Sequence, residues 1–412
     1  MPPLWQRIGV IILFFLAVAM FGFFLYWFFW KPILAPEAPS PTITTTTGLI
    51  GAGPAGTRTT STIIGGGLPG GAITIGGATT TVTVTLGTPT NAQLLVKDPA
   101  LFSRITTGGQ IVYYNATDQK FYRVDSNGNI VSLSDQVFYN VQNAVFDSSG
   151  DKAVIQYPGG FNIVYDFARN KQITLPSHWQ DFEFAPNNET ISFKNIGLDP
   201  ENRFLVTAKY DGSNTKIIEQ IGDNANKVQP NWSPNSQIVA TYTEGKDATR
   251  SDVYFLGQNN ENFKSMVVEG RDFRGLWSPS GDNMLYSVYD PANDFTPQLW
   301  IVSASGDSIG DNRQKINLQT WADSCTFASE TIALCSVPQT MPANAGLDQR
   351  VLAGIPDDLY AVNLASGATQ LISTPDSITQ IKQVMYSANS VDKIFITDNY
   401  TNNIYQISLT NQ

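Results

Sequence analysis

The hydrophobic pattern divides the chain into an unbroken apolar run, a polar stretch with little charge, and a long region of short alternating segments. Residues 8–30 contain no charged residue and no proline, so a helix there would be apolar on every face. At about 1.5 Å per residue, such a helix crosses the roughly 30 Å hydrocarbon core of a bilayer. The run ends in aromatic residues and Lys31, which is typical of a membrane interface. We therefore predict a transmembrane signal anchor over residues 8–30.

The distribution of positive charge sets the expected orientation of this anchor. Arg7 and the amino terminus precede the run, and Lys31 follows it. The positive-inside rule then favours a short cytoplasmic segment over residues 1–7. We expect a single-pass membrane protein whose remaining chain lies outside the cytoplasm.

Residues 31–91 are dominated by Thr, Gly and Pro and carry only Lys31, Glu37 and Arg58 as charged residues. Such a stretch has too little apolar surface to offset the entropy lost on ordering, so we predict a flexible linker that serves as a stalk. Within it, residues 73–86 alternate β-branched and other residues. This segment is either a strand that adds to another sheet or a β-prone part of the linker.

The region over residues 92–412 consists of a repeated unit. Its clearest copies begin at Trp232-Ser233-Pro234 and Trp277-Ser278-Pro279, and each is followed by a β-branched strand. An aromatic or aliphatic anchor precedes a tight turn in every unit. These anchors are Ile105, Phe146, Phe184, Trp232, Trp277, Phe327 and Tyr386. Their spacing is typical of the four-stranded blades of a β-propeller, which repeat every ~40–50 residues.

The order of strands predicts how the propeller closes. After Tyr386 the chain supplies two further strands, and a spare strand over residues 92–96 precedes the first anchor. If the spare strand completes the last blade, both chain ends meet and an open sheet edge is removed. We therefore predict an all-β fold, a seven-bladed β-propeller of four-stranded blades, over residues 92–412.

The two Trp-Ser-Pro lines resemble the WD40-like repeat of TolB-type β-propellers, and similar repeats occur in propellers of the prolyl oligopeptidase and dipeptidyl peptidase families. The resemblance covers residues 92–412. The family's usual Pro-Asp-Gly is replaced here by Pro234-Asn235-Ser236 and Pro279-Ser280-Gly281. TolB itself carries an α/β domain before its propeller, where this chain has the predicted anchor and linker. The resemblance therefore implies the architecture and does not carry over TolB's partners.

Charge and composition exclude several classes of function. The net charge is −10, and because the first 91 residues hold three basic residues and one acidic residue, the propeller region carries −12. An acidic domain without a basic cluster does not bind nucleic acid. The chain has one histidine and two cysteines, so we expect no metal and no other cofactor.

The one match to a hydrolase motif does not predict an enzyme. Residues 306–310 read Gly-Asp-Ser-Ile-Gly, but they fall in a polar turn between two expected strands. A nucleophile elbow needs a strand, a turn and a helix, with the histidine after the serine. Here His178 precedes Ser308. We predict that the protein is not an enzyme.

The two cysteines, Cys325 and Cys335, flank the first turn of the sixth blade. They therefore lie on neighbouring antiparallel strands, as a cross-strand disulfide or as two buried thiols.

Long loops predict the binding face. Loops from the second to the third strand of a blade, and from one blade to the next, share one face, and the long insertions fall there. The inter-blade loops should present His178, Trp179, Arg271 and Arg274, and Tyr289, Asp290, Asp294 and Phe295 should line the rim. An aromatic surface of mixed charge suits a peptide or sugar.

We interpret the chain as a membrane-tethered, extracytoplasmic scaffold that binds a protein, a peptide or a cell-envelope polymer. Two alternatives stay open. One is a propeller enzyme of lactonase or lyase type with a metal in its central channel. The other is a structural subunit of an envelope assembly that uses residues 73–86 to extend a sheet.

Overall fold

The structure is a computed structural model that describes Met20, Phe23 and residues 92–259, 261–375, 378–390 and 393–409. Apart from Met20 and Phe23, the predicted anchor at 8–30 lies outside the described residues. The predicted linker at 31–91, with its segment 73–86, lies outside them too. The part of the chain that is described contains no helix with the length and apolar character needed to cross a bilayer. The anchor and the linker stay predictions.

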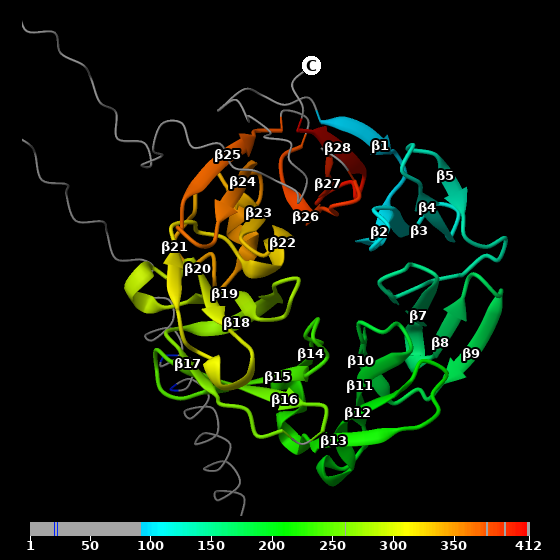
Figure 1. Cartoon of the computed structure of the whole chain (residues 1–412), viewed down its shortest axis with the longest axis horizontal. Helices are drawn as coiled ribbons and strands as arrows, with labels where there is room; N and C mark the ends of the chain where they lie inside the picture. Colours follow the sequence, from blue (N-terminus) through cyan, green and yellow to red (C-terminus); the bar gives the residue numbers. More distant parts are fainter. Residues whose placement is uncertain are drawn as a thin grey trace, which may run out of the picture. The chain divides into compact units, whose positions relative to one another are not determined.

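The described residues form seven four-stranded antiparallel sheets, the blades, arranged around a common axis (Figure 1). Blade 1 holds β2 (Ala100–Ile105), β3 (Ile111–Asn115), β4 (Lys120–Val124) and β5 (Ile130–Ser132). Blade 2 holds β6 (Asn143–Phe146), β7 (Lys152–Gln156), β8 (Asn162–Asp166) and β9 (Lys171–Leu175). Blade 3 holds β10 (Trp179–Phe184), β11 (Thr190–Ile196), β12 (Arg203–Lys209) and β13 (Lys216–Gln220). Blade 4 holds β14 (Val228–Pro230), β15 (Ile238–Gly245), β16 (Ser251–Gly257) and β17 (Met266–Val268).

Blades 5, 6 and 7 follow the same order. Blade 5 holds β18 (Arg271–Trp277), β19 (Asn283–Tyr289), β20 (Pro297–Ser303) and β21 (Gln314–Ile316). Blade 6 holds β22 (Cys325–Ser329), β23 (Ile332–Pro338), β24 (Asp357–Asn363) and β25 (Thr369–Ser373). Blade 7 holds β26 (Ile381–Met385), β27 (Lys393–Asp398), β28 (Ile404–Ser408) and β1 (Gln93–Val96). Short 3-10 helices lie in the connections: η2 (Pro158–Gly160), η3 (Pro200–Asn202), η4 (Gly222–Lys227), η5 (Pro291–Asn293), η6 (Gly306–Ser308), η7 (Ala322–Ser324) and η8 (Gln349–Leu352).

Blade 7 is completed by the first strand, which confirms the predicted closure. Strand β1 pairs antiparallel with β28, with Gln93 opposite Gln406 and Val96 opposite Ile404. In Figure 1 the cyan β1 lies beside the red β28 although nearly the whole domain separates them in sequence. The pairing removes an edge that would otherwise expose unpaired backbone groups.

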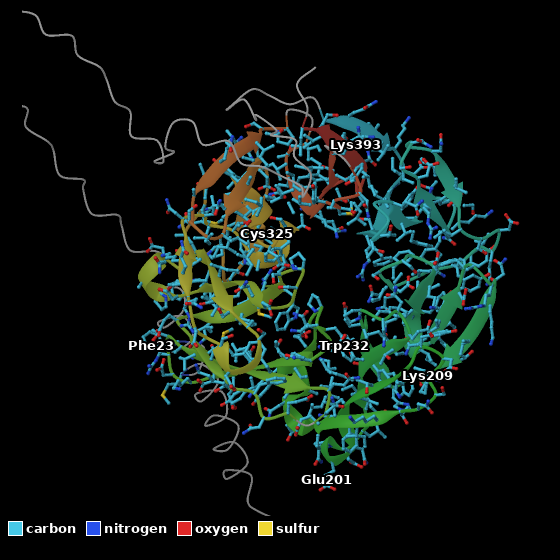
Figure 2. All side chains as sticks on the ribbon, in the orientation of Figure 1. Phe23, Glu201, Lys209, Trp232, Cys325 and Lys393 are labelled. Atoms are coloured by element: carbon cyan, nitrogen blue, oxygen red, sulfur yellow. A yellow bond between two sulfur atoms is a disulfide. The ribbon has the colours of Figure 1, made fainter. Side chains whose placement is uncertain are left out.

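The predicted anchors pack between neighbouring blades. Five of the seven, Phe146, Phe184, Trp232, Trp277 and Tyr386, are at most 9% exposed, whereas Ile105 and Phe327 are half-buried. Figure 2 shows Trp232 near the axis, whereas Glu201 lies at the periphery. Full burial of an aromatic or branched side chain stabilises the fold by about 1.5–3 kcal/mol, so these anchors hold blade against blade.

In the two clearest repeats, the turn after the anchor is shaped by a serine side chain that bonds back to the backbone. The Ser233 hydroxyl accepts from the Ile238 N–H at 2.9 Å and donates to Asn235 Oδ1 at 2.6 Å. The fourth turn residue adopts a left-handed conformation, with φ of 61° at Ser236 and 79° at Gly281. Glycine takes this conformation at least cost. Ser236 therefore makes this turn without the glycine of the usual Pro-Asp-Gly.

The two cysteines form a disulfide across β22 and β23. Cys325 and Cys335 are register partners in this hairpin, with Cα atoms 4.1 Å apart. Both residues are buried, and Figure 2 shows Cys325 in blade 6. The structure thus selects the disulfide over two buried thiols.

We expect the double variant Cys325→Ser/Cys335→Ser to unfold with a free energy lower by about 2–3 kcal/mol, because the ten-residue cross-link no longer restricts the unfolded chain. Urea denaturation with and without a reductant measures the difference. Wild-type protein in reductant should match the variant in oxidant. A wild-type curve that a reductant leaves unchanged would contradict the disulfide.

Candidate binding face and its polar pocket

Several connections lie on one face of the propeller, which we call the loop face. It is formed by the connections from the second to the third strand of each blade and from each blade to the next. Its second-to-third-strand connections include 197–202, 246–250, 290–296 and 339–356. Their placement follows from strand order, because successive antiparallel strands return the chain to alternate ends of the sheet. Length alone does not single out this face, because the third-to-fourth-strand connection 304–313 of blade 5 is also long and lies on the opposite face.

Two predicted residues, His178 and Trp179, lie at the start of blade 3 but differ in burial. His178 is exposed in the loop between β9 and β10. Trp179 is only 7% exposed, because its ring stacks on Phe193 with centroids 3.8 Å apart. The expectation that Trp179 faces a ligand is therefore wrong. Sequence position placed it in a loop, whereas it is the first residue of β10 and packs in the core.

The four predicted rim residues, Tyr289, Asp290, Asp294 and Phe295, stand together at the tip of blade 5. The Asp290 carboxylate accepts from the Asn293 N–H at 3.1 Å and from Asn293 Nδ2 at 2.6 Å. The Tyr289 and Phe295 rings meet edge to face with centroids 6.4 Å apart. Asp290 thus shapes its own loop, and the loop holds the two rings beside it.

The loop over residues 339–356, which we call the blade 6 loop, is tied to the blades on both sides. Toward blade 5, the Asn344 and Gly346 N–H groups donate to the carbonyls of Asp294 and Phe295, each at 2.8 Å. A Cβ at Gly346 would come within 2.6 Å of the Phe295 carbonyl and the Tyr289 ring, so a larger residue does not fit.

Toward blade 7, the blade 6 loop is held by two side chains. The Gly354 N–H donates to Tyr400 Oη at 3.1 Å. The Gln380 side-chain amide donates to the Leu352 carbonyl. The blade 6 loop therefore spans three blades as a fixed bridge.

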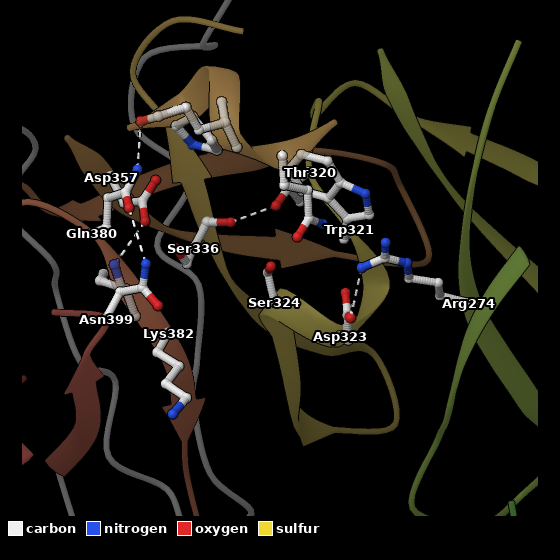
Figure 3. A pocket seen from close by; sticks show the side chains of 14 residues that line it. Arg274, Thr320, Trp321, Asp323, Ser324, Ser336, Asp357, Gln380, Lys382 and Asn399 are labelled. Carbon is white, nitrogen blue, oxygen red and sulfur yellow. Dashed lines mark hydrogen bonds and ion pairs between the residues drawn. The ribbon is translucent and has the colours of Figure 1, made fainter. Parts of the chain in front are cut away.

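A polar cavity of about 260 Å³ lies beside this bridge, across blades 5, 6 and 7 (Figure 3). Its lining combines charged, amide and hydroxyl side chains with a few apolar ones. The lining residues are Arg274, Thr320, Trp321, Asp323, Ser324, Ser336, Pro338, Gln349, Leu352, Asp357, Gln380, Ile381, Lys382 and Asn399. Figure 3 shows Asp357, Gln380 and Asn399 on one side and the Asp323–Arg274 pair on the other.

Asp357 is the buried carboxylate of this pocket. It begins β24, is 8% exposed, and accepts from the Ile381 N–H of blade 7 at 2.7 Å. The Ser336 hydroxyl also bonds to it. Burial disfavours the charged form and raises the pKa of Asp357 to about 6, although these hydrogen bonds work in the opposite direction. Asp357 therefore changes charge close to neutral pH.

Arg274 is the predicted binding residue that lines the pocket. Its guanidinium pairs with Asp272 at 2.8 Å and with Asp323 at 2.9 Å, and it lies 5.8 Å from the centroid of the Trp321 ring. Two carboxylates thus neutralise its charge. Arg271, at the start of the same strand, instead donates to the Asp247 carbonyl of the blade 4 loop.

Most of the pocket residues were not among the predicted ones. Asp357, Gln380, Lys382 and Asn399 lie together because β26 packs against blade 6, where the Ile381 N–H donates to Asp357. The acidic pair Asp357-Asp358 at the start of a predicted strand was the available signal. The burial of Asp357 depends on its contact with blade 7.

Exposed large apolar side chains mark the same face. Among the described residues of the propeller, five exposed large apolar side chains lie in strands. The others lie in connections between strands, and all of these connections are on the loop face. The side chains in connections are Tyr139, Phe161, Leu198, Leu347, Val351 and Tyr400. Leu198 is 98% exposed and Tyr139 68% exposed. Leu347 and Val351 lie on the blade 6 loop, which bonds to Tyr400 through Gly354.

Two further features concern metal binding and the Gly-Asp-Ser-Ile-Gly segment. Within the part of the chain that the structure describes, no group of three or more His, Cys, Asp or Glu side chains is placed to hold a metal ion. Ser308 lies in η6 between β20 and β21, and its hydroxyl donates to the Ser305 carbonyl at 2.7 Å. The turn predicted for the Gly-Asp-Ser-Ile-Gly segment is confirmed.

The comparisons with known proteins support the fold alone. No family model matches the chain, and no curated protein matches it. The β-propeller domain of Cps50 (Swd1) from Myceliophteria thermophila is 11% identical, with a TM-score of 0.52 over 78% of this chain and 100% of that one.

Two other similar structures bear on the predicted resemblance. The chain covers 34% of the tricorn protease, at 12% identity and a TM-score of 0.49 over 79% of this chain. TolB from Acinetobacter baumannii is 9% identical, with a TM-score of 0.40 over 68% of this chain and 62% of that one. At TM-scores below 0.5, neither similarity supports a function.

The buried Asp357 should give the protein a specific pH dependence. Its pKa is about 6 in the fold against an ordinary value of 3.8, so its protonation favours folding. This contribution is fully present below about pH 4 and is lost as the pH rises through 6, by about 3 kcal/mol. The Asp357→Asn variant lacks it. The variant's free energy of unfolding, minus that of wild type, should therefore rise from pH 4 to pH 7. A difference that stays constant with pH would contradict the burial of this carboxyl.

Proposed function

We propose that the protein is a non-enzymatic binding module that engages a protein partner through the loop face. One observation carries this proposal: among the described residues, the large apolar side chains that are exposed in connections between the propeller's strands all lie on that face. Leu347 and Val351 share the blade 6 loop, which bonds to Tyr400, and neighbouring exposed apolar side chains of this kind are typical of interaction sites. The partner buries them, and the rigid ring of blades holds them in place.

The pocket and the blade 6 loop support the same assignment. The loop is fixed by backbone hydrogen bonds toward blade 5 and by the Tyr400 and Gln380 side chains toward blade 7, so little conformational entropy is lost when a partner binds it. Next to it lies a polar cavity lined by donors and acceptors, which supplies orientation. We call the exposed Leu347 and Val351 of the blade 6 loop the crest; it lies beside the polar pocket. Burial of the apolar crest would supply affinity, and the polar groups of the pocket would supply specificity.

The membrane tether is the second part of the proposal. Residues 8–30 form an uncharged run long enough to span a bilayer, and residues 31–91 provide reach. We propose that they display the propeller outside the cytoplasm. The disulfide supports an oxidising compartment, because cytosolic proteins rarely keep one.

The binding proposal predicts that charge on the crest abolishes partner recovery. The full-length protein, solubilised from membranes, is used as bait, and its partner is quantified by mass spectrometry. We expect Leu347→Asp/Val351→Asp to lower recovery at least tenfold, because a buried unpaired carboxylate opposes association. The matched control is Ile217→Asp, which alters a side chain that is 58% exposed on β13, away from the loop face. If partner recovery fell equally in both variants, or fell in neither, the proposed surface would be contradicted.

The topology proposal predicts release of a folded fragment. Protease added to intact cells should cut within residues 31–91 and free a fragment that contains the propeller, because the compact blades resist cleavage. Immunoblotting with an antibody against the propeller follows the fragment. Complete protection in cells without an outer barrier would place the propeller in the cytoplasm and contradict the proposal.

A further inference from the structure

We propose that the polar pocket beside the blade 6 loop binds a cationic side chain, the lysine or arginine of a peptide segment of the partner. This inference rests on the proposed function and names the chemistry of one subsite.

Asp357 is the group that lacks a counter-ion. Within the described residues its carboxylate bonds to the Ile381 N–H and the Ser336 hydroxyl, and no basic residue is among the groups that act on it. It is more than nine-tenths buried and lines the cavity. A buried carboxylate without a cation is unfavourable, and a bound cation would relieve that cost.

The other charged groups of the pocket are already satisfied. Arg274 is paired with Asp272 and Asp323, so its positive charge is not free to balance Asp357. Lys382 donates to Asn402 Oδ1 at 2.7 Å, and Figure 3 shows its side chain extending away from Asp357. Asp358, the next residue, adds negative charge near the site. The uncompensated charge of the pocket is therefore negative.

Size and surroundings fit a side chain of a peptide. A cavity of about 260 Å³ exceeds by several-fold the ~30 Å³ that one water occupies, so it holds a chain of several heavy atoms. The carboxamides of Gln380 and Asn399 lie beside Asp357 and supply further acceptors. Leu347 and Val351, on the adjoining loop, contact the apolar neighbours of the cation in the same peptide.

The test uses two pentapeptides, acetyl-Leu-Ala-Lys-Ala-Leu-amide and its glutamine counterpart, which differ only in the central charge. Each is titrated into the full-length protein by isothermal calorimetry at pH 7.5. We expect the lysine peptide to bind at least tenfold more tightly than the glutamine peptide. The Asp357→Asn variant should lose that preference, whereas Asp199→Asn, which removes an exposed carboxylate elsewhere on the loop face, should keep it.

A measurement on the wild-type protein makes the result independent of how the variants fold. At pH 6 about half of the Asp357 carboxyls carry a proton, and a bound cation expels it. Titration in two buffers of different ionisation enthalpy should therefore show release of about half a proton per lysine peptide and none for the glutamine peptide. Equal affinity for the two peptides, absence of proton release, or an unchanged preference in Asp357→Asn would overturn the proposal.

The outcome is separable from that of the proposed function. The peptide titration does not involve the natural partner, and the Leu347→Asp/Val351→Asp experiment leaves Asp357 unchanged. If the crest variant keeps its partner while the lysine peptide binds through Asp357, the proposed surface is wrong and the cation pocket stands. If the crest variant loses its partner and both peptides bind equally, the surface stands and the cation pocket is overturned.

Discussion

The antiparallel pairing of β1 with β28 joins the two ends of the domain and thereby closes the ring of blades. Val96 and Ile404 face each other across this pairing and belong to one buried cluster that also contains Ile111 of blade 1 and Phe395 of blade 7. Without β1, blade 7 would lack its outer strand and would expose an edge. A ring that is closed at this seam resists the separation of neighbouring blades.

The candidate site depends on that resistance because it is built between blades. Asp357 of blade 6 accepts from Ile381 of blade 7, and the Asp323–Arg274 pair reaches blade 5. The blade 6 loop spans the same three blades. Loss of contact between blades 6 and 7 would expose Asp357 to water and return its pKa toward the ordinary value. Ring closure therefore maintains a buried carboxylate that an isolated blade could not bury.

The repeat made much of the fold predictable, because its anchors and turns act locally. Trp277 and the turn after it appear together in the sequence, and the spare strand before Ile105 indicated the closure. The pocket was harder to predict, since Asp357 and Asn399 come together only through packing of blades 6 and 7. Trp179 was misplaced for a related reason: its contact with Phe193 lies across the blade and leaves no local signal.

Hydrogen exchange of the full-length protein tests most directly whether closure and the pocket form one cooperative unit. Two sets of amides should be protected from exchange: those of β1 that pair with β28, and the Ile381 amide that donates to Asp357. Both should exchange with the same free energy of opening. The account predicts that this value approaches the global free energy of unfolding. Exchange of the β1 amides at a much lower free energy, with Ile381 still fully protected, would show that the pocket does not depend on closure.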